Sequence, residues 1–271
     1  RSAVLAENMV ATSQPLATQA GVRILQSGGN AIDAALTAAI VLTVVEPTGN
    51  GLGSDAIALV FDGKKVLAIN GTGHSPESWE RERFKSMQKI PLFGWDAVTV
   101  PGAVKLWWHL SERFGRLSFQ ALFENAIQYA RNGYHVGNKI AQEWLRYSDI
   151  IENPSESFKK EFNPIPAVGD WIRRKELGLT LEKIALKGPA TFYGGELAVS
   201  MVNQSNKEGG SWKIDDLASF TPEWVEPIKV NFRHSEILEI PPNSQGIYAL
   251  AALGVLNYLP IAKMDSVDFF H

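Results

Sequence analysis

Residues 30–61 read NAIDAALTAAIVLTVVEPTGNGLGSDAIALVF, and this stretch decides the fold class. Asn30 with Asp33 three residues later resembles a helix capping box, and the apolar run that follows predicts a helix buried on most sides. Pro47 ends that helix, and a glycine-rich loop leads into an apolar strand at 56–61. A buried helix followed directly by a strand predicts helices layered on a sheet.

The neighbouring segments extend this pattern on both sides. A helix is predicted over 15–27, because Pro15 suits a first helical turn and two glycines follow the segment. The strand at 56–61 and a second strand at 65–69 flank a DGK turn, which predicts an antiparallel hairpin. Because the first strand is apolar almost throughout, we expect the sheet to be covered on both faces.

The rest of the chain predicts helices interleaved with antiparallel strands. The proline-containing stretch 152–170 also holds apolar residues, so we interpret it as an ordered excursion and not as a linker. The sequence therefore predicts a single α+β domain over residues 1–271. Further helices are predicted at 103–114, 119–131, 139–151, 196–204 and 245–259, and a second hairpin from strands 228–232 and 236–240.

Composition excludes several classes of protein. The chain has 271 residues, of which 45% are hydrophobic and 20% charged, and this excludes intrinsic disorder as its main state. A net charge of −3 argues against a nucleic-acid partner, and the absence of cysteine excludes a disulfide framework, a thiolate zinc site and a cysteine nucleophile. None of the five histidines has the spacing of a metal ligand, so we expect no metal or organic cofactor.

The most apolar stretch, residues 31–45, is shorter than a bilayer requires, so no membrane partner is expected. The sequence opens Arg-Ser-Ala-Val, without an initiator methionine or a leader-like segment. This N-terminal sequence does not determine the cellular compartment, and we slightly favour the cytoplasm.

Two loops beside the first hairpin are candidate sites. The loop with Gly49, Gly51 and Gly53 lacks the Lys-Ser/Thr of a P-loop and follows a helix, so we interpret its glycines as places where the backbone passes close to another element. A phosphate cradle is the alternative. Residues 71–76, GTGHSP, directly follow a buried strand, where sites are commonly built, and an ordinary turn is the alternative there.

Blocks of the sequence that carry a resemblance to a known family lie at 8–26, 28–35, 45–47 with the glycine loop, 100–102, 114–117, 192–196, 216–218 and 241–246. They resemble the gamma-glutamyltransferase family and keep the family's order across nearly the whole chain. The resemblance implies an N-terminal-nucleophile hydrolase, a four-layer αββα sandwich of which this chain is the large-subunit portion. It also implies a precursor that cuts itself in two, with a small subunit that completes the sheet.

The reaction implied by the resemblance is the cleavage of γ-glutamyl amides such as glutathione. A new N-terminal Thr of the small subunit attacks the amide with its own amine as base, and the acyl group passes to water or to an amino acceptor. Backbone N–H groups hold the oxyanion. The family's nucleophile motif is absent from residues 1–271, so we assign no catalytic residue to this chain and expect activity only with the small subunit.

Two departures from the family pattern concern the acyl group. The family's Arg that binds the α-carboxylate aligns with Thr72, and the Glu after it aligns with Gly73. The acylase-like branch, which includes cephalosporin (glutaryl) acylases, often has Gly-x-Gly-Arg-x-Pro, and His74 takes the place of that Arg. The NSQG block at 243–246 also resembles this branch. We therefore assign Thr72 and His74 to substrate binding, and keep two alternatives: a glutaryl or cephalosporin acylase-like amidase, and an unprocessed, non-catalytic scaffold.

Overall fold

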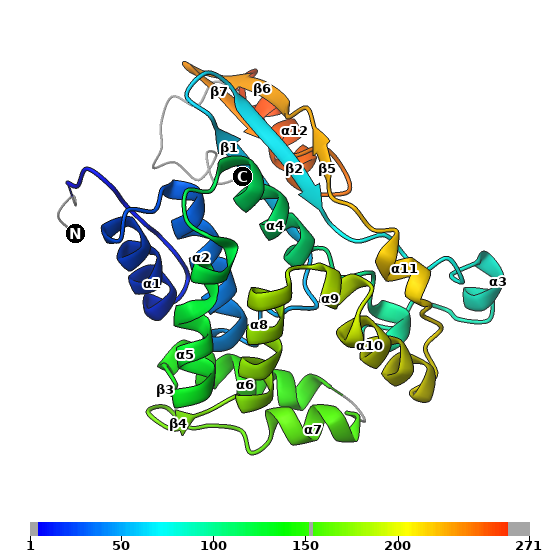
Figure 1. Cartoon of the computed structure of the whole chain (residues 1–271). Helices are drawn as coiled ribbons and strands as arrows, with labels where there is room; N and C mark the ends of the chain where they lie inside the picture. Colours follow the sequence, from blue (N-terminus) through cyan, green and yellow to red (C-terminus); the bar gives the residue numbers. More distant parts are fainter. Residues whose placement is uncertain (1–4, 152–153, 260–271) are drawn as a thin grey trace.

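The computed structural model describes residues 5–151 and 154–259 of the chain. Figure 1 shows a body of helices with a layer of strands along one side of it. The helix α4 (Ala103–Phe114) lies between the two and packs against the strands β1 (Ala56–Phe61) and β2 (Val66–Gly71). The fold class is α+β, as predicted.

Two helices at the centre of the helical body confirm the sequence prediction. α1 (Pro15–Gln26) begins after Gln14, whose side-chain oxygen accepts N–H groups of the first turn. α2 (Ala31–Val45) begins with the predicted capping box. Most of α2 is buried, because α1 packs along one side of it and α5 (Glu124–Asn132) along another.

Asp33 does more than cap α2. Its side chain is fully buried, and its carboxylate accepts the backbone N–H of Asn30 at 2.8 Å and that of Arg116 at 3.1 Å. The N–H of Leu117 lies 3.4 Å from the same carboxylate. A buried carboxylate persists only where such donors satisfy it. Asp33 therefore ties the start of α2 to the segment that follows α4.

The main sheet is antiparallel, with strand order β1-β2-β5. β1 and β2 pair along their whole length, so that Ala56 lies opposite Gly71. The short strand β5 (Glu223–Val225) adds to the other edge of β2. α4 covers one face of this sheet and buries Val60 and Ile69 against it.

The other face of this sheet is buried at Ala68 of β2 but open along β1, so the expectation that both faces are covered is wrong for β1 among the described residues. Alternate residues of β1 point to opposite faces. Ile57, Leu59 and Phe61, which point away from α4, are 48%, 43% and 68% exposed. The strand is apolar on both sides, but the described residues leave its side chains on this face exposed.

The other predicted elements are present, with ends shifted by up to three residues. The predicted helix at 119–131 is divided: it begins as a 3-10 turn, η2 (Phe119–Phe123), and continues as α5 until Gly133, whose φ of 98° ends it. The rest are α6 (Asn138–Ile150), α10 (Glu196–Lys207), α12 (Gly246–Leu256) and the hairpin of β6 (Ile228–Phe232) with β7 (Ser235–Glu239).

One long helix, α8 (Lys175–Lys187), was not predicted, although Leu177, Leu181 and Ile184 recur on one face with helical spacing. Within the stretch 152–170, the structure describes residues 154–170, and residues 152–153 lie outside the described residues. Its packing confirms the interpretation as an excursion, since Trp144 Nε1 donates to the Phe162 carbonyl at 3.0 Å. The other unpredicted elements are short: α3 (Arg81–Phe84), η1 (Trp95–Ala97), β3 (Tyr134–His135), α7 (Glu156–Phe162), β4 (Trp171–Ile172), α9 (Ala190–Tyr193), α11 (Ile214–Ala218) and β5.

α12 is apolar along most of its length but is poorly buried. Only Leu250 is buried within the helix, while Tyr248 is 74% and Val255 62% exposed. Figure 1 shows the helix against β6 and β7, which it contacts on one side. Across residues 5–151 and 154–259, no helix has both the length and the apolar character needed to cross a bilayer.

Candidate functional site

Three of the sequence blocks and the GTGHSP loop meet at one end of the main sheet. The glycine loop enters β1 and the GTGHSP loop leaves β2, and the pairing of Ala56 with Gly71 brings both loops to the same end. The tip of the β2 arrow in Figure 1 marks this end. The segments 100–102 and 241–246 reach it from elsewhere in the chain through hydrogen bonds.

The backbones of the GTGHSP loop and of segment 100–102 lie in direct contact. A Cβ on Gly73 would stand 1.4 Å from the carbonyl oxygen of Val100, and a Cβ on Gly102 would stand 1.7 Å from that of Gly71. The N–H of Val100 donates to the carbonyl of His74 at 3.0 Å. Only glycine permits so close an approach, so Gly73 and Gly102 fix how the loop leaves the strand.

The glycines of the loop at 48–55 do not have the role that we predicted for them. A Cβ on Gly49 or Gly53 would meet nothing within 4 Å, and one on Gly51 would find its first neighbour at 3.8 Å. Among the described residues, the backbone therefore passes close to no other element at these three glycines. The close approach is made by glycines 71, 73 and 102 instead.

A buried carboxylate holds the glycine loop in place. Glu46 Oε2 accepts a hydrogen bond from the side chain of Asn50 at 2.9 Å and from the Ser13 hydroxyl at 2.6 Å. At the far end of the loop, the Ser54 carbonyl accepts the N–H groups of Gly102 and Ala103 at the start of α4. The loop is thus fixed at both ends, while its glycines stay uncovered.

Thr72 lies in a cluster of uncharged polar side chains. Its backbone N–H and hydroxyl both lie within bonding distance of Asn70 Oδ1, at 2.9 Å and 2.6 Å. The hydroxyl is also 2.9 Å from Asn243 Oδ1, which accepts a hydrogen bond from Asn70 Nδ2 at 3.0 Å. Asn70 and Asn243 were not assigned to the site from the sequence. We call Asn70, Thr72 and Asn243 the amide cluster.

His74 points to a different part of the site. Its Nδ1 lies 2.9 Å from the Ser75 carbonyl, and its ring centroid is 6.1 Å from that of Phe220. The side chain is exposed. No hydrogen bond joins His74 to Thr72 in the described part of the chain, so the structure brings Thr72 to Asn243 and leaves His74 beside Phe220.

Two further blocks hold these loops in place through buried side chains. Asp216 accepts the N–H of Glu77 at 2.8 Å, just after the GTGHSP loop. The Tyr193 hydroxyl donates to the Pro101 carbonyl at 2.7 Å and accepts the N–H of Lys105 at 3.1 Å. Both side chains are buried and position backbone, so blocks 192–196 and 216–218 hold the site in shape without lining it.

The buried tyrosines predict a loss of stability at alkaline pH. Burial raises the pKa of Tyr193 and of Tyr134, whose hydroxyl donates to the Val44 carbonyl at 2.8 Å. Since an unfolded tyrosine ionises near pH 10, stability is retained below that pH and falls above it, by about 1.4 kcal/mol per pH unit for each tyrosine. In urea unfolding curves between about pH 9 and 12, Tyr193→Phe should roughly halve this slope. The exposed Tyr248→Phe should leave it unchanged.

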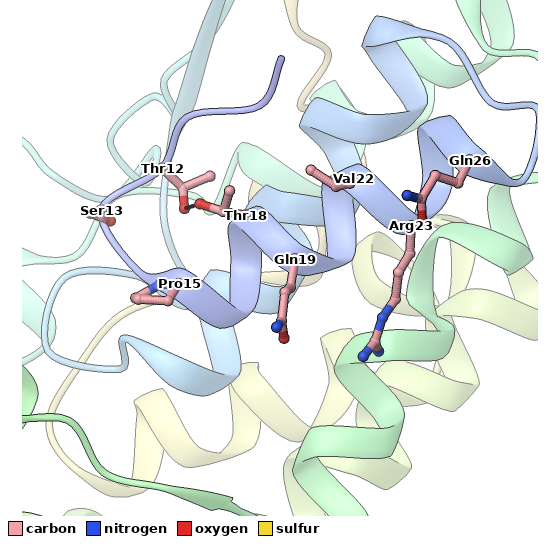
Figure 2. A pocket seen from close by; sticks show the side chains of 8 residues that line it. All are labelled: Thr12, Ser13, Pro15, Thr18, Gln19, Val22, Arg23 and Gln26. Atoms are coloured by element: carbon pink, nitrogen blue, oxygen red, sulfur yellow. Dashed lines mark hydrogen bonds between the residues drawn. The ribbon is translucent and has the colours of Figure 1, made fainter. Parts of the chain in front are cut away.

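Figure 2 shows a hollow that lies apart from this sheet end, along α1. It has a volume of about 600 Å³, with Thr12 and Thr18 at one end and Arg23 and Gln26 at the other. The two threonine hydroxyls lie 2.6 Å apart and bond to each other, with no base beside them in this hollow. An unactivated hydroxyl is a weak nucleophile, so the hollow is not the candidate active site. Within the described ranges, no three His, Asp or Glu side chains gather as ligands for a metal.

The comparisons with known proteins agree with this arrangement of blocks. The sequence profile named "Gamma-glutamyltranspeptidase" matches residues 17–270. The chain belongs to the gamma-glutamyltranspeptidase family. A curated member, the glutathione hydrolase-like YwrD proenzyme of Bacillus subtilis (strain 168), is 34% identical over 279 residues, which cover 100% of this chain and 53% of that protein.

Solved structures of gamma-glutamyltranspeptidase relatives share the fold. The cephalosporin acylase from Bacillus halodurans superposes with a TM-score of 0.91 at 39% identity, covering 100% of this chain and 54% of the other. The gamma-glutamyltranspeptidase of Helicobacter pylori has a TM-score of 0.93 at 26% identity, covering 100% and 81%. These similarities confirm the N-terminal-nucleophile hydrolase fold. The chain spans about half the length of the curated relatives it matches.

Proposed function

We propose that this chain is the large-subunit portion of an N-terminal-nucleophile amidohydrolase that cleaves γ-glutamyl amides such as glutathione. The nucleophile is a Thr at the start of a small subunit cut from the same precursor. The observation that carries the proposal is similarity along the whole chain to proteins named as glutathione hydrolase or glutathione hydrolase-like proenzymes. The role of this chain is then to bind and orient the acyl group, with Thr72 and His74 at the binding site.

The uncovered apolar surfaces support a second subunit. Ile57, Leu59 and Phe61 line the open face of the main sheet, and α12 exposes Tyr248 and Val255. Contiguous apolar patches of this kind mark surfaces that another chain or segment covers. A second sheet packed on the open face would bury them at the spacing of about 10 Å that is usual between stacked sheets.

The experiment that tests the proposal is intact mass measurement and N-terminal sequencing of the complete purified protein that contains this chain. A second polypeptide that begins with Thr is the expected result, together with release of p-nitroaniline from γ-glutamyl-p-nitroanilide. Replacing that Thr by Ala should leave one unprocessed chain without activity. A precursor that stays intact under conditions that mature its relatives would instead support the scaffold alternative.

His74 gives a prediction at residue level. If its side chain lines the acyl pocket, His74→Ala should raise KM for acidic acyl substrates by about threefold, since one hydrogen bond is lost. His74→Arg should lower KM for substrates with an α-carboxylate, because Arg is always charged and offers a bidentate fork. Steady-state kinetics on the matured protein measures both variants. An unchanged KM in both would remove His74 from the pocket.

The second candidate function is that of a glutaryl or cephalosporin acylase-like amidase. One observation favours it: the cephalosporin acylase of Bacillus halodurans is 39% identical to this chain and covers all of it. The uncharged Thr72, which bonds to Asn70 and Asn243, does not separate the two candidates, because γ-glutamyl and glutaryl groups carry the same terminal carboxylate and differ in the α-amino group. Comparing hydrolysis of γ-glutamyl and glutaryl anilides by the matured protein separates the two candidates.

A further inference from the structure

The amide cluster leaves hydrogen-bond donors at its outer end. Asn70 Oδ1 accepts the backbone N–H of Thr72, which cannot be an acceptor, so the orientation of the Asn70 amide is fixed. Asn70 Nδ2 is then a donor, and the atom of Asn243 that faces it must be Oδ1. The Nδ2 group of Asn243 consequently points away from the cluster, with two N–H donors that have no partner among the described residues.

Among residues 5–151 and 154–259, acidic side chains lie near the amide cluster, and no basic side chain bonds to it. Glu223 lies directly opposite Asn70 across the β2–β5 pair, so the two side chains share one face of the sheet. The carboxylate of Glu239 lies against the turn at Gly246, three residues beyond Asn243. A carboxylate bound at the amide cluster would share this face of the sheet with Glu223, which carries the same charge.

The basic side chains nearby are directed elsewhere. The guanidinium of Arg113 stacks on the ring of Trp224 at 4.1 Å, and Trp224 points to the face of the sheet opposite to Glu223. Lys105 donates to the carbonyl of Phe220. Both cations belong to α4, which covers the other face of the sheet. His74, as described, lies against Phe220.

We infer that Asn243, held by Asn70 and Thr72, recognises the end of the acyl chain as a hydrogen-bond acceptor and not as a negative charge. This inference rests on the proposed function, because it places the acyl chain at the GTGHSP loop. An amide N–H bonds equally well to a carboxamide or hydroxyl oxygen, whereas a carboxylate removed from water needs a partner of opposite charge. Acyl groups that end in an uncharged carbonyl are therefore hydrolysed with kcat/KM values similar to those of acyl groups that end in a carboxylate.

A matched pair of substrates tests this in the complete, matured protein. Glutaryl-p-nitroanilide and 4-carbamoylbutanoyl-p-nitroanilide have acyl chains of the same length and differ only in a terminal carboxylate or carboxamide. We expect wild-type kcat/KM values for the two within about threefold, or in favour of the carboxamide. Thr72→Arg should shift the ratio at least about tenfold toward the carboxylate, since a guanidinium forms a charge-assisted, bidentate pair with it. Thr180→Arg, on the surface of α8, adds the same charge elsewhere and should shift nothing.

Two variants of Asn243 test the donor directly. Asn243→Ala should lower kcat/KM for both substrates by about tenfold, mainly through KM, whereas Asn138→Ala, exposed on α6, should not. Asn243→Asp keeps the shape of the side chain and still accepts the hydrogen bond from Asn70. It can therefore replace Asn243→Ala in this test if the alanine variant does not mature. It should shift the ratio about tenfold toward the carboxamide, because two carboxylates repel.

The outcomes separate the inference from the proposed function. Hydrolysis with a wild-type preference of more than about tenfold for the carboxylate would overturn the inference and keep the amidohydrolase. Equal kcat/KM values for Asn243→Ala and Asn138→Ala on both substrates would likewise overturn the inference and keep the amidohydrolase. No hydrolysis of either anilide, or of γ-glutamyl-p-nitroanilide, by a fully processed protein would overturn the proposed function and the inference with it.

Discussion

Gly73→Ala is expected to lower the free energy of unfolding by about 3 kcal/mol or more, the upper range for forcing an extra methyl group into a packed site. The added Cβ would stand 1.4 Å from the Val100 carbonyl oxygen, which is a backbone atom and cannot rotate away. The loop would have to leave segment 100–102, and the hydrogen bond from the Val100 N–H to the His74 carbonyl would be lost. Urea unfolding followed by tryptophan fluorescence measures the change.

Gly137→Ala is the matched control for Gly73→Ala. Gly137 precedes α6 with a φ of −77°, and a Cβ there meets nothing within 4 Å. Its effect should stay within about 0.5 kcal/mol, as for other unconstrained surface positions. Similar unfolding midpoints for the two variants would show that the contact between the GTGHSP loop and segment 100–102 is not as tight as the structure has it.

Asp33→Ala is expected to destabilise the protein by about 3–5 kcal/mol, because buried N–H donors would lose a charged acceptor. The fully buried carboxylate serves the N–H groups of Asn30, Arg116 and Leu117 together, and alanine can replace none of these bonds. Asp33→Asn keeps one acceptor oxygen and should lose less. Thermal and urea unfolding of the three proteins would give this order.

The exposed Asp215→Ala is the control for charge removal. Asp215 lies in the first turn of the short helix α11, and its side chain makes no hydrogen bond within the described ranges. We expect a change within about 0.5 kcal/mol. If Asp33→Ala were as mild as Asp215→Ala, the carboxylate would not be the link between α2 and the segment after α4.

Local patterns in the sequence predict the elements that have strong start and stop signals. The capping box at Asn30 and the glycine at 133 mark helix ends because the backbone itself requires those residue types there. Strand β5 has three residues and no alternating pattern of its own, so it forms only because the edge of β2 is available to it. Such an element is set by tertiary pairing.

The candidate site was only half predictable for a similar reason. The GTGHSP loop could be singled out because it follows a strand, and Thr72 because it aligns with the family's carboxylate-binding Arg. Its partner Asn243 is 171 residues away in the chain, and no periodic pattern connects them. The glycines show the same limit. Both the triplet at 49–53 and the pair at 71–73 are spaced two apart, yet only the second pair meets another backbone. The spacing of glycines in the sequence does not indicate which backbone segment packs against them.

The open face of the main sheet has a consequence for how such a protein is made. An isolated chain that exposes Ile57, Leu59 and Phe61, together with an exposed apolar helix, would associate with other copies of itself before it bound the second subunit. If both halves are synthesised as one polypeptide and cut only after folding, the complement is tethered at an effective concentration on the order of millimolar. Late cleavage would then also guarantee equal numbers of the two halves, without a chaperone dedicated to pairing them.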